Sequence, residues 1–269
     1  MESGTTLSEE QVVEAALRLN NAEKSQEQIP TLTSIHPNIT FSDAYAIQDK
    51  WVQLKVGIGR AIVGHKVGLT SKVMQEAFGI DEPDFGVLLD DMIFNSGEVI
   101  PIGKYIEPRI EVELAFVFKD ELDLENISHE MIKASTKYVI PAMELIDFRT
   151  VGNDPGHKRT VKDTIADNAA NAAVVRGDKA IPQEIGLDTV SAVLYKNGEK
   201  ATDGVASAIL GHPLNSMAWL LNKYKSIGRK IKEGQLVLAG SFTAPIPVQK
   251  RDEIVADFGQ YGKVSCKFE

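Results

Sequence analysis

Residues 110–118 alternate between two kinds of side chain, and this period of two predicts a β-strand. One face of the strand is apolar and carries Ile110, Val112, Leu114, Phe116 and Phe118. The other face begins with Glu111 and Glu113 and continues in Ala115 and Val117. Two carboxylates two residues apart on a strand point the same way and lie close enough to share one cation.

The apolar continuation of the glutamate face bears on where that face lies in the fold. It indicates a face that runs from a polar opening into an interior, where carboxylates need a metal, a proton or a cationic partner. The alternative is a solvated strand face that carries two glutamates, because half-exposed strands often show this pattern.

Helical spacing of apolar residues predicts longer helices over residues 7–25, 41–56, 128–137 and 213–227. In the first helix, Ser8 is the expected N-cap and Gln11 occupies the capping-box position. In the second helix, Ser42 is the expected cap. Residues 26–40 are expected to form a loop. A short helix over residues 70–79 is expected to end at Gly79.

Strand patterns dominate the remainder of the chain. They fall at residues 61–69, 98–101, 110–118, 138–147, 170–176, 187–196, 235–239, 245–248 and 253–268, with one short strand after the turn IDEPDFG. Asn197-Gly198 predicts a tight hairpin. We therefore expect an α+β fold with an N-terminal helical lobe over residues 1–60 and a β-rich body over residues 61–269.

Composition and charge narrow the class of protein. The chain has 269 residues, 43% hydrophobic residues and a net charge of -9, with no basic run that would favour nucleic acid or an anionic membrane as a partner. Cys266 is the only cysteine, so an intrachain disulfide is excluded. The N-terminus lacks the features of a signal peptide, and no apolar run reaches the roughly 18 residues of a membrane span. These features predict a soluble, cytoplasmic protein.

A third carboxylate, Glu144, lies in the apolar, strand-like run YVIPAMELID. Together with Glu111 and Glu113 it forms an oxygen-only set, which suits Mg²⁺ or Mn²⁺ and leaves coordination positions for water and substrate. The five histidines are scattered and no H-E-x-x-H or C-x-x-C occurs, so the sequence does not support zinc. The spacing of the three glutamates is a weak signal by itself.

Lys66 and Asp84 are candidate catalytic residues. Alternation places Lys66 between Gly64 and Gly68 on one strand face, where the glycines leave it open space to aim an ammonium at an anionic substrate or a developing enolate. Asp84 follows Pro83 on a turn. A surface lysine and a turn aspartate that bonds its own backbone are the alternatives.

Three further residues are weaker candidates for substrate binding. Asp163 lies in KDTIADNAAN, whose polar side chains could instead cap a helix and bind backbone. Ser241 and Thr243 lie in GSFTAPIPV beside a glycine, where backbone can approach a ligand closely.

Five sequence blocks together resemble the fumarylacetoacetate hydrolase superfamily, and within it the hydratase and decarboxylase branch of aromatic meta-cleavage pathways. The blocks are GHKVGLTS, IDEPDFGVLLDDM, PRIEVELAFV, VIPAMELID with DTIADNAANA, and GHPLNSMAWL with LAGSFTAPIPV. They span essentially the whole chain. Within the branch the chain is most similar to 2-oxohept-4-ene-1,7-dioate hydratases, followed by 2-hydroxypenta-2,4-dienoate hydratases and 4-oxalocrotonate decarboxylases.

The resemblance implies roles for the candidate residues. The metal ligands of the branch fall on Glu111, Glu113 and Glu144, its lysine on Lys66 and its aspartate on Asp84. It implies a mixed β-roll or barrel around a buried cavity, with an N-terminal helical lobe and a homo-oligomeric assembly. It also implies water addition to a 2-hydroxy-dienoate or 2-oxo-alkenoate, which gives a 4-hydroxy-2-oxo acid. Decarboxylation of 4-oxalocrotonate uses the same enolate chemistry and stays open.

The segment DFRTVGNDPGHKRTVKDT between Glu144 and Asp163 is basic and resembles the longer connection of heptenedioate hydratases. We expect this loop to cover the cavity and Arg159 to bind a second, distal carboxylate of the substrate. A solvated basic loop is the alternative. Two other functions remain as alternatives: hydrolysis of a C–C bond in an acylpyruvate, and a non-enzymatic protein that binds a divalent ion for structure alone.

Overall fold

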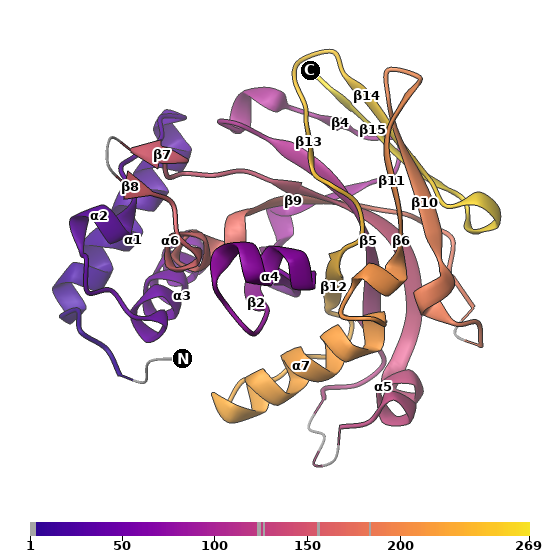
Figure 1. The fold of residues 1–269 in the computed structure, drawn as a ribbon, viewed down its shortest axis with the longest axis horizontal. Helices are drawn as coiled ribbons and strands as arrows, with labels where there is room; N and C mark the ends of the chain where they lie inside the picture. The colour runs from indigo at the N-terminus through magenta and orange to yellow at the C-terminus, as the bar shows by residue number, and fades with distance from the viewer. Residues whose placement is uncertain (1–3, 123–124, 126, 155–156, 183) are drawn as a thin grey trace.

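The computed structural model describes residues 4–122, 125, 127–154, 157–182 and 184–269 (Figure 1). The helices are α1 (Glu9–Ser25), α2 (Leu32–Ile35), α3 (Phe41–Gly57), α4 (Lys72–Phe78), α5 (His129–Ser135), α6 (Val161–Ala166) and α7 (Pro213–Ser226). The strands before residue 160 are β1 (Ile62–Gly68), β2 (Asp84–Leu89), β3 (Ile93–Asn95), β4 (Val99–Ile100), β5 (Arg109–Phe118), β6 (Thr136–Ile146), β7 (Asn153–Asp154) and β8 (His157–Lys158). The later strands are β9 (Asn171–Arg176), β10 (Ser191–Lys196), β11 (Glu199–Val205), β12 (Leu236–Ser241), β13 (Ile246–Pro247), β14 (Glu253–Asp257) and β15 (Lys263–Phe268).

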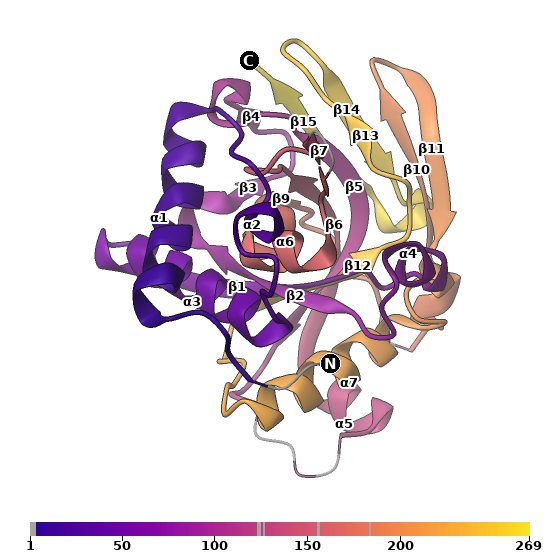
Figure 2. The ribbon, with the colours of Figure 1, turned by 60° about the vertical axis from the view of Figure 1, so that its left-hand side comes forward.

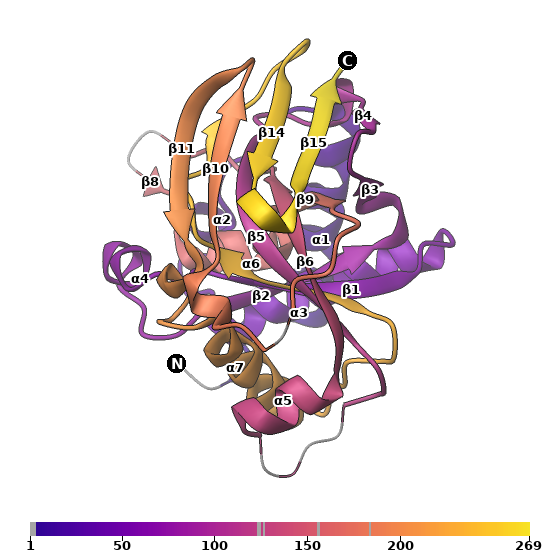
Figure 3. The ribbon, with the colours of Figure 1, turned by 90° about the vertical axis from the view of Figure 1, so that its right-hand side faces the viewer.

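Two sheets form the body of the protein. The larger has the order β2-β1-β12-β5-β6-β9-β3, with β13 also paired to β5, and the smaller has the order β11-β10-β14-β15-β4. Figure 3 shows the smaller sheet lying across the long strands β5 and β6. The mixed α+β class is therefore confirmed. Within the described residues the larger sheet ends at β2 and β3 and forms no closed barrel, so the roll or barrel detail is not confirmed.

The two faces of β5 enter different apolar clusters, as the alternation predicts. Val112 and Leu114 belong to a cluster that includes Leu194 and Ile254 of the smaller sheet. On the opposite face, residues beyond Glu113 enter a second cluster that contains Leu88, Ala115, Val117, Ala142 and Leu238. The glutamates therefore lie at the polar end of a strand face whose other end is buried in apolar side chains.

The N-terminal helices form a third apolar cluster, which they share with β2 and α6. Figure 2 shows α1 and α3 flanking the short α2 and α6. Helix α1 begins with the predicted capping box, in which Ser8 accepts from the Gln11 backbone N–H. The expected Ser42 cap of α3 is wrong: Thr40 is the N-cap, because its backbone is extended and its hydroxyl accepts from the Asp43 backbone N–H.

Other local predictions have mixed outcomes. Asn197 and Gly198, with φ of 54° and 84°, join β10 to β11 in the predicted hairpin, and Gly79 ends α4 in the left-handed conformation. The expected loop at 26–40 contains α2, and the expected strand at 253–268 is two strands. Among the described residues, no helix has both the length and the apolar character needed to cross a membrane.

Candidate metal and substrate site

The three predicted glutamates converge on one point. Pairing of β5 with β6 places Glu111 directly opposite Glu144, and Glu113 lies two residues further along β5. Each carboxylate offers an oxygen atom, and these oxygens all lie within 4.8 Å of one another. Glu113 and Glu144 are buried and Glu111 is partly buried. This is the separation at which three carboxylates can bind one small cation.

Hydrogen bonds hold each carboxylate while leaving oxygens free. The Gly240 backbone N–H donates to Glu113 Oε2 at 2.7 Å, and Asn171 Nδ2 donates to Glu144 Oε1 at 2.8 Å. Glu113 Oε1 and Glu144 Oε2 are buried and have no hydrogen-bond partner among the described residues. Buried carboxylate oxygens without a donor fit a hard divalent cation, which would supply the missing partner.

The pKa shifts of Glu111 and Glu113 show that placing the negative charges of the three glutamates together in a buried site is unfavourable. Burial, and next the charge of Glu144, raise the pKa of Glu111 and of Glu113 above the usual value of a glutamate. Without a cation, protons are therefore held in the cluster near neutral pH. Cation and protons compete for the same oxygens, so cation binding is expected to strengthen as pH rises.

Lys66 and Asp84 complete the site from the neighbouring strands β1 and β2. Lys66 Nζ lies 3.3 Å from Glu144 Oε1, and both side chains are buried. Burial lowers the pKa of Lys66, but the charges of Glu144, Asp84 and the other two glutamates outweigh that effect and raise it above the usual value. The lysine therefore carries a fixed positive charge at neutral pH.

Asp84 is only 1% exposed, and its Oδ1 has no hydrogen-bond partner among the described residues. Burial raises the pKa of Asp84, against the opposing effect of the Lys66 ammonium. A carboxyl group with a raised pKa and a free oxygen suits proton transfer.

Gly68 sets the spacing of this pair. A methyl group on Gly68 would lie 2.2 Å from Asp84 Oδ1 and 3.0 Å from Lys66 Nζ, closer than carbon contacts allow. The expectation of open space beside Lys66 is wrong for Gly64: a methyl group there would lie 2.0 Å from the Leu236 carbonyl oxygen, because β12 packs against it. Gly68 therefore lets Asp84 and Lys66 approach each other, and Gly64 lets the backbone of β12 approach β1.

A left-handed turn positions Asn171. Residues 168–170 have φ between 51° and 58°, a conformation that L-residues disfavour. Asn168 holds the turn to β2: its Oδ1 accepts from the Val87 N–H at 2.8 Å and its Nδ2 donates to the Val87 carbonyl at 2.9 Å. The turn leads directly into β9, and Asn171, the first residue of that strand, reaches Glu144.

The weaker candidates lie in three different settings. Ser241 hydrogen bonds to Glu111, and this bond opposes the upward shift of the Glu111 pKa. Thr243 Oγ1 accepts from the Val112 backbone N–H at 3.0 Å and so fastens the loop after β12 to β5. Asp163 is fully buried, and its two oxygens accept from Thr33 and Thr160, which connects α6 to the N-terminal helices.

Arg159 lies outside the glutamate cluster, on the segment after β8. Its guanidinium carbon lies 3.8 Å from the centre of the Phe148 ring, and it donates to the Thr150 side chain and carbonyl. Burial lowers its pKa, and the charges of Asp167, Glu107 and Asp163 oppose this shift only in part. Arg109 shares the strand face of Glu111 by alternation.

Sequence reasoning missed Asn171, the Gly240 N–H and the close approach at Gly68. The Asn171 side chain and the Gly240 backbone N–H lie 27 and 127 residues along the chain from the glutamates to which they donate, so no local pattern links them. A buried carboxylate does require N–H donors, and the run DNAANA beside the metal-binding block is the one signal that could have directed attention to Asn171.

Comparisons with known proteins bear on the identity of this site. No protein-family model matches the chain in a scan of such models. The Escherichia coli protein 2-oxo-hept-4-ene-1,7-dioate hydratase is 48% identical over 256 residues, which cover 94% of this chain and 96% of that protein.

Two solved structures resemble this chain to different degrees. The 4-oxalocrotonate decarboxylase from Pseudomonas putida G7, complexed with magnesium and adipate, superposes with a TM-score of 0.93 at 34% identity, over 99% of this chain and 100% of that one. A fumarylacetoacetate hydrolase family protein from Yersinia pestis CO92 has a TM-score of 0.57 at 15% identity, over 76% of this chain and 92% of that one, and shows the shared fold alone. The chain therefore belongs to the family that contains these 2-oxo-alkenoate hydratases and 4-oxalocrotonate decarboxylases, and it shares the fold of fumarylacetoacetate hydrolase family proteins.

Proposed function

We propose that the protein is a divalent-metal-dependent hydratase that adds water to a 2-oxo-alkenoate, with 2-oxo-hept-4-ene-1,7-dioate as the substrate. The product is a 4-hydroxy-2-oxo acid. The observation that carries this function is the convergence of three buried carboxylates beside Lys66. The 48% identity to an Escherichia coli protein named for this reaction supports the same substrate.

Each residue of the site has a defined task in this reaction. Glu111, Glu113 and Glu144 would hold the ion, which when bound supplies Lewis-acid polarisation of the 2-oxo group. Lys66 stabilises the negative charge that develops on the substrate when the enol and keto forms interconvert. Asp84 takes the proton of the water that adds at C4, because its carboxyl lies next to Lys66 and has a free oxygen.

Magnesium is the proposed native ion, with manganese as a second choice. The oxygen-only ligand set supports either ion. The Pseudomonas putida decarboxylase is complexed with magnesium in one structure and with calcium in another, which supports a divalent cation as the cofactor.

The principal competing function is decarboxylation of 4-oxalocrotonate, because it uses the same enolate chemistry. Identity favours the hydratase: 48% with the hydratase against 34% with a curated decarboxylase of Pseudomonas. One ultraviolet assay with Mg²⁺ separates the two. The hydratase predicts loss of the conjugated dienoate absorbance with a product heavier by one water, whereas release of CO₂ would assign the decarboxylase.

We propose that Arg159 contributes to recognition of the distal carboxylate of a seven-carbon diacid. Its guanidinium is half-buried over the Phe148 ring, and a guanidinium can bind a carboxylate through two parallel hydrogen bonds. Arg159→Ala is expected to lower kcat/KM for the seven-carbon diacid and to leave the five-carbon monoacid nearly unchanged. Equal loss on both substrates would defeat this role.

Several broader properties stay proposals. We propose that residues 1–60 act as a helical lobe on a catalytic body formed by residues 61–269, packed on that body through the apolar cluster that the N-terminal helices share with β2 and α6. The β-roll description, a homo-oligomeric assembly and a cytoplasmic location follow from the family resemblance and from the composition. Asp163, Ser241 and Thr243 stay candidates for substrate contact.

A further inference from the structure

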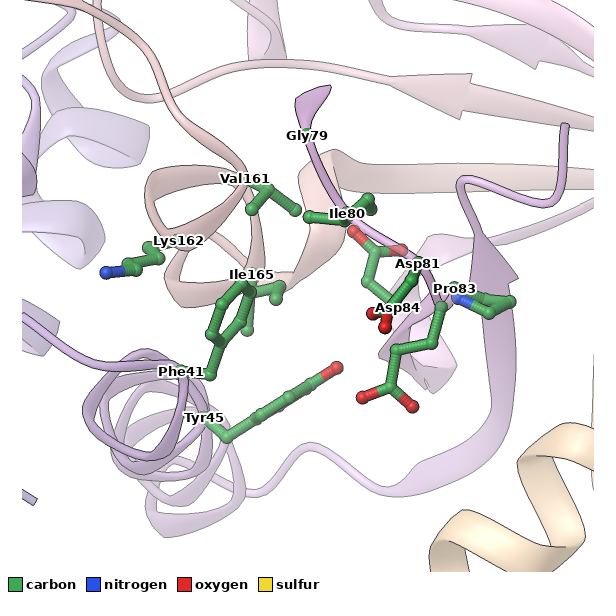
Figure 4. A pocket seen from close by; sticks show the side chains of 11 residues that line it. Phe41, Tyr45, Gly79, Ile80, Asp81, Pro83, Asp84, Val161, Lys162 and Ile165 are labelled. Carbon is green, nitrogen blue, oxygen red and sulfur yellow. The ribbon is translucent and has the colours of Figure 1, made fainter. Parts of the chain in front are cut away.

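A cavity of about 500 Å³ lies between α3, α6 and the loop that leads into β2 (Figure 4). Asp84 forms part of its wall, whereas Lys66 and the three glutamates are not among the described residues that line it. The cavity therefore reaches the candidate base without passing through the glutamate cluster.

Tyr45 projects from α3 into this cavity with its hydroxyl directed toward Asp84 (Figure 4). Its ring stacks on Phe85, with 4.3 Å between ring centres and 13° between ring planes, which fixes its orientation. The Tyr45 hydroxyl is buried, its oxygen faces the Phe85 backbone N–H, and its proton has no acceptor among the described residues; Asp84 Oδ1 likewise has no partner among them. Two such atoms facing one cavity are satisfied by ordered water between them.

The charges around the cavity favour water over the substrate. Asp81, Glu82 and Asp84 line it, and Lys162, the one lysine among the described residues of its wall, donates its Nζ to the Ile39 carbonyl at 2.8 Å. Lys223 pairs with Glu82 and Lys66 lies beside Asp84, so the described wall has no excess of positive charge to attract a dianionic 2-oxo acid, while its carboxylate oxygens can accept hydrogen bonds from water. Glu82 is also held in place by Trp219 and Lys223 of α7, so the loop that carries Asp84 is fixed.

We propose that this cavity is a water-filled proton route to Asp84, and that Tyr45 is the positioning residue that orders the water beside the Asp84 carboxyl. The route rests on the proposed function, in which Asp84 takes a proton from the water that adds at C4 and exchanges protons with C3 of the enolate, so that hydration as a whole takes up as many protons as it releases. The route lets Asp84 exchange its proton with solvent. Asp84 passes this proton to the ordered water, Tyr45 accepts a proton from that water, and its own hydroxyl proton passes to the next water outward. At the end Asp84 is ionised and Tyr45 is neutral, so no charge accumulates.

The properties of the phenol suit this task. Burial, and next the charge of Asp84, raise the pKa of Tyr45 well above its usual value, so the hydroxyl keeps its proton at neutral pH. It can then donate and accept a hydrogen bond at the same time.

The test compares wild-type protein with Tyr45→Phe, which keeps the ring on Phe85 and removes only the hydroxyl. Two readouts are used: hydration of the 2-oxo-alkenoate, and Mg²⁺-dependent exchange of the C3 protons of 2-oxopentanoate in D₂O, followed by NMR. The second probe can enolise but cannot be hydrated. We expect kcat and the exchange rate to fall at least about tenfold, with KM unchanged and a larger solvent isotope effect on kcat.

Two further variants sharpen the result. Ile80→Trp places a larger side chain in the cavity and leaves residues 45 and 84 unchanged, so it should slow proton exchange in the same way. Tyr261→Phe is the control: it also removes one phenol hydroxyl, but this hydroxyl accepts from Gln260 Nε2 at an exposed position outside the cavity, so exchange and kcat should stay within about twofold.

The outcomes distinguish failure of the proton route from failure of the proposed hydratase function. Wild-type exchange rates and isotope effects in both Tyr45→Phe and Ile80→Trp would overturn the proton route while leaving the hydratase function in place. A wild-type protein that neither hydrates the alkenoate nor exchanges the 2-oxo acid would overturn the proposed function, and the proton route with it.

Discussion

Gly68 shows how strongly one residue constrains this site. The lysine and the carboxylate that would handle charge and protons converge where a glycine leaves room for both. Neighbouring strands deliver them: Gly68 on β1 pairs with Asp84 on β2, and Lys66 lies two residues before Gly68 on the same face. The absence of a side chain at position 68 is therefore part of the site.

Gly68→Ala is predicted to lower kcat/KM by at least about 100-fold, because its methyl group would displace both Asp84 Oδ1 and Lys66 Nζ by a sizeable fraction of an ångström. Mg²⁺ affinity should change much less, since the glutamates are not displaced. Gly57→Ala is the matched control, because a methyl group there meets no atom within 4 Å. Similar activity in the two variants would show that Asp84 does not act at this position.

Residues on a single strand were within reach of prediction from the sequence. Glu111 and Glu113 follow from alternation, and their shared face is confirmed by the cluster that Ala115 and Val117 enter. The Gly240 N–H donor could not be predicted from the sequence, because it contacts Glu113 only through the pairing of β5 with β12. Sequence patterns describe one element at a time, and a buried site is built from several.

At the scale of elements, β1 is fastened to helix α7 through His65, which lies on the strand face opposite Lys66. Its Nδ1 lies 2.8 Å from the Tyr224 hydroxyl and its Nε2 lies 3.2 Å from Gln235 Oε1. Burial lowers the pKa of His65 to about 4. A neutral imidazole is therefore part of the packing that holds the strand of Lys66 in place.

This histidine predicts a pH dependence of stability. Because its folded-state pKa lies below the usual 6.5, protonation favours the unfolded chain. The stabilisation is present above pH 6.5 and is lost as pH falls toward 4. Between pH 7 and pH 5 it should decrease by about 2 kcal/mol, measured as the free energy of unfolding in urea.

His65→Gln serves as the reference for that measurement, since glutamine does not titrate. The difference between wild type and variant isolates the histidine from the buried carboxylates, whose raised pKa values act in the opposite direction. If the two proteins lose equal stability between pH 7 and pH 5, His65 is not neutral and buried in the folded protein.

Local element signals were predictive where the chemistry is local. Ser8 with Gln11 and the Asn197-Gly198 hairpin act within a few residues, and both are confirmed. The Ser42 cap is wrong by two positions, because a threonine with extended backbone was available at position 40. The turn at 168–170 could not be predicted, since alanine has no local preference for φ above zero.

At the scale of the molecule, the glutamate cluster links activity to stability. Three coupled carboxylates in a buried place are unfavourable until a cation or protons neutralise them. An ion that binds only the folded state stabilises it by mass action, by about 2.7 kcal/mol when its concentration is 100 times its dissociation constant.

Saturating Mg²⁺ is therefore predicted to raise the melting temperature of the wild-type protein by about 5 °C, and a chelator should reverse the shift. Glu113→Gln should lose both the shift and turnover, because it removes one ligand. Glu107→Gln is the control, since it removes a charge just before the same strand, outside the cluster. A full Mg²⁺ shift in Glu113→Gln would exclude this residue as a ligand.

The sheet order marks the limit of prediction for the whole chain. The strands and the α+β class follow from residue patterns, but the order β2-β1-β12-β5-β6-β9-β3 joins strands from both ends of the sequence. Such pairing depends on which apolar faces cover one another, and many arrangements satisfy the same patterns. Resemblance across whole blocks of sequence supplied the fold that periodicity could not.

The left-handed turn at residues 168–170 also bears on the order in which parts of the chain fold. Each L-residue in this conformation is disfavoured by roughly 1–2 kcal/mol, so the turn has no reason to form before β2 is present to bind Asn168. It should therefore be among the last parts of the chain to fold, and Asn171 would reach Glu144 only then.

Asn168→Ala tests this order of events. It removes two buried hydrogen bonds to Val87 and should cost about 2–4 kcal/mol of stability. If the turn forms late, nearly all of that loss will appear as faster unfolding, with the refolding rate unchanged. A slower refolding rate of matching size would instead place the turn in the folding nucleus. On the late-folding view, the hydrogen bond that positions Glu144 forms only as the chain reaches its final packed state.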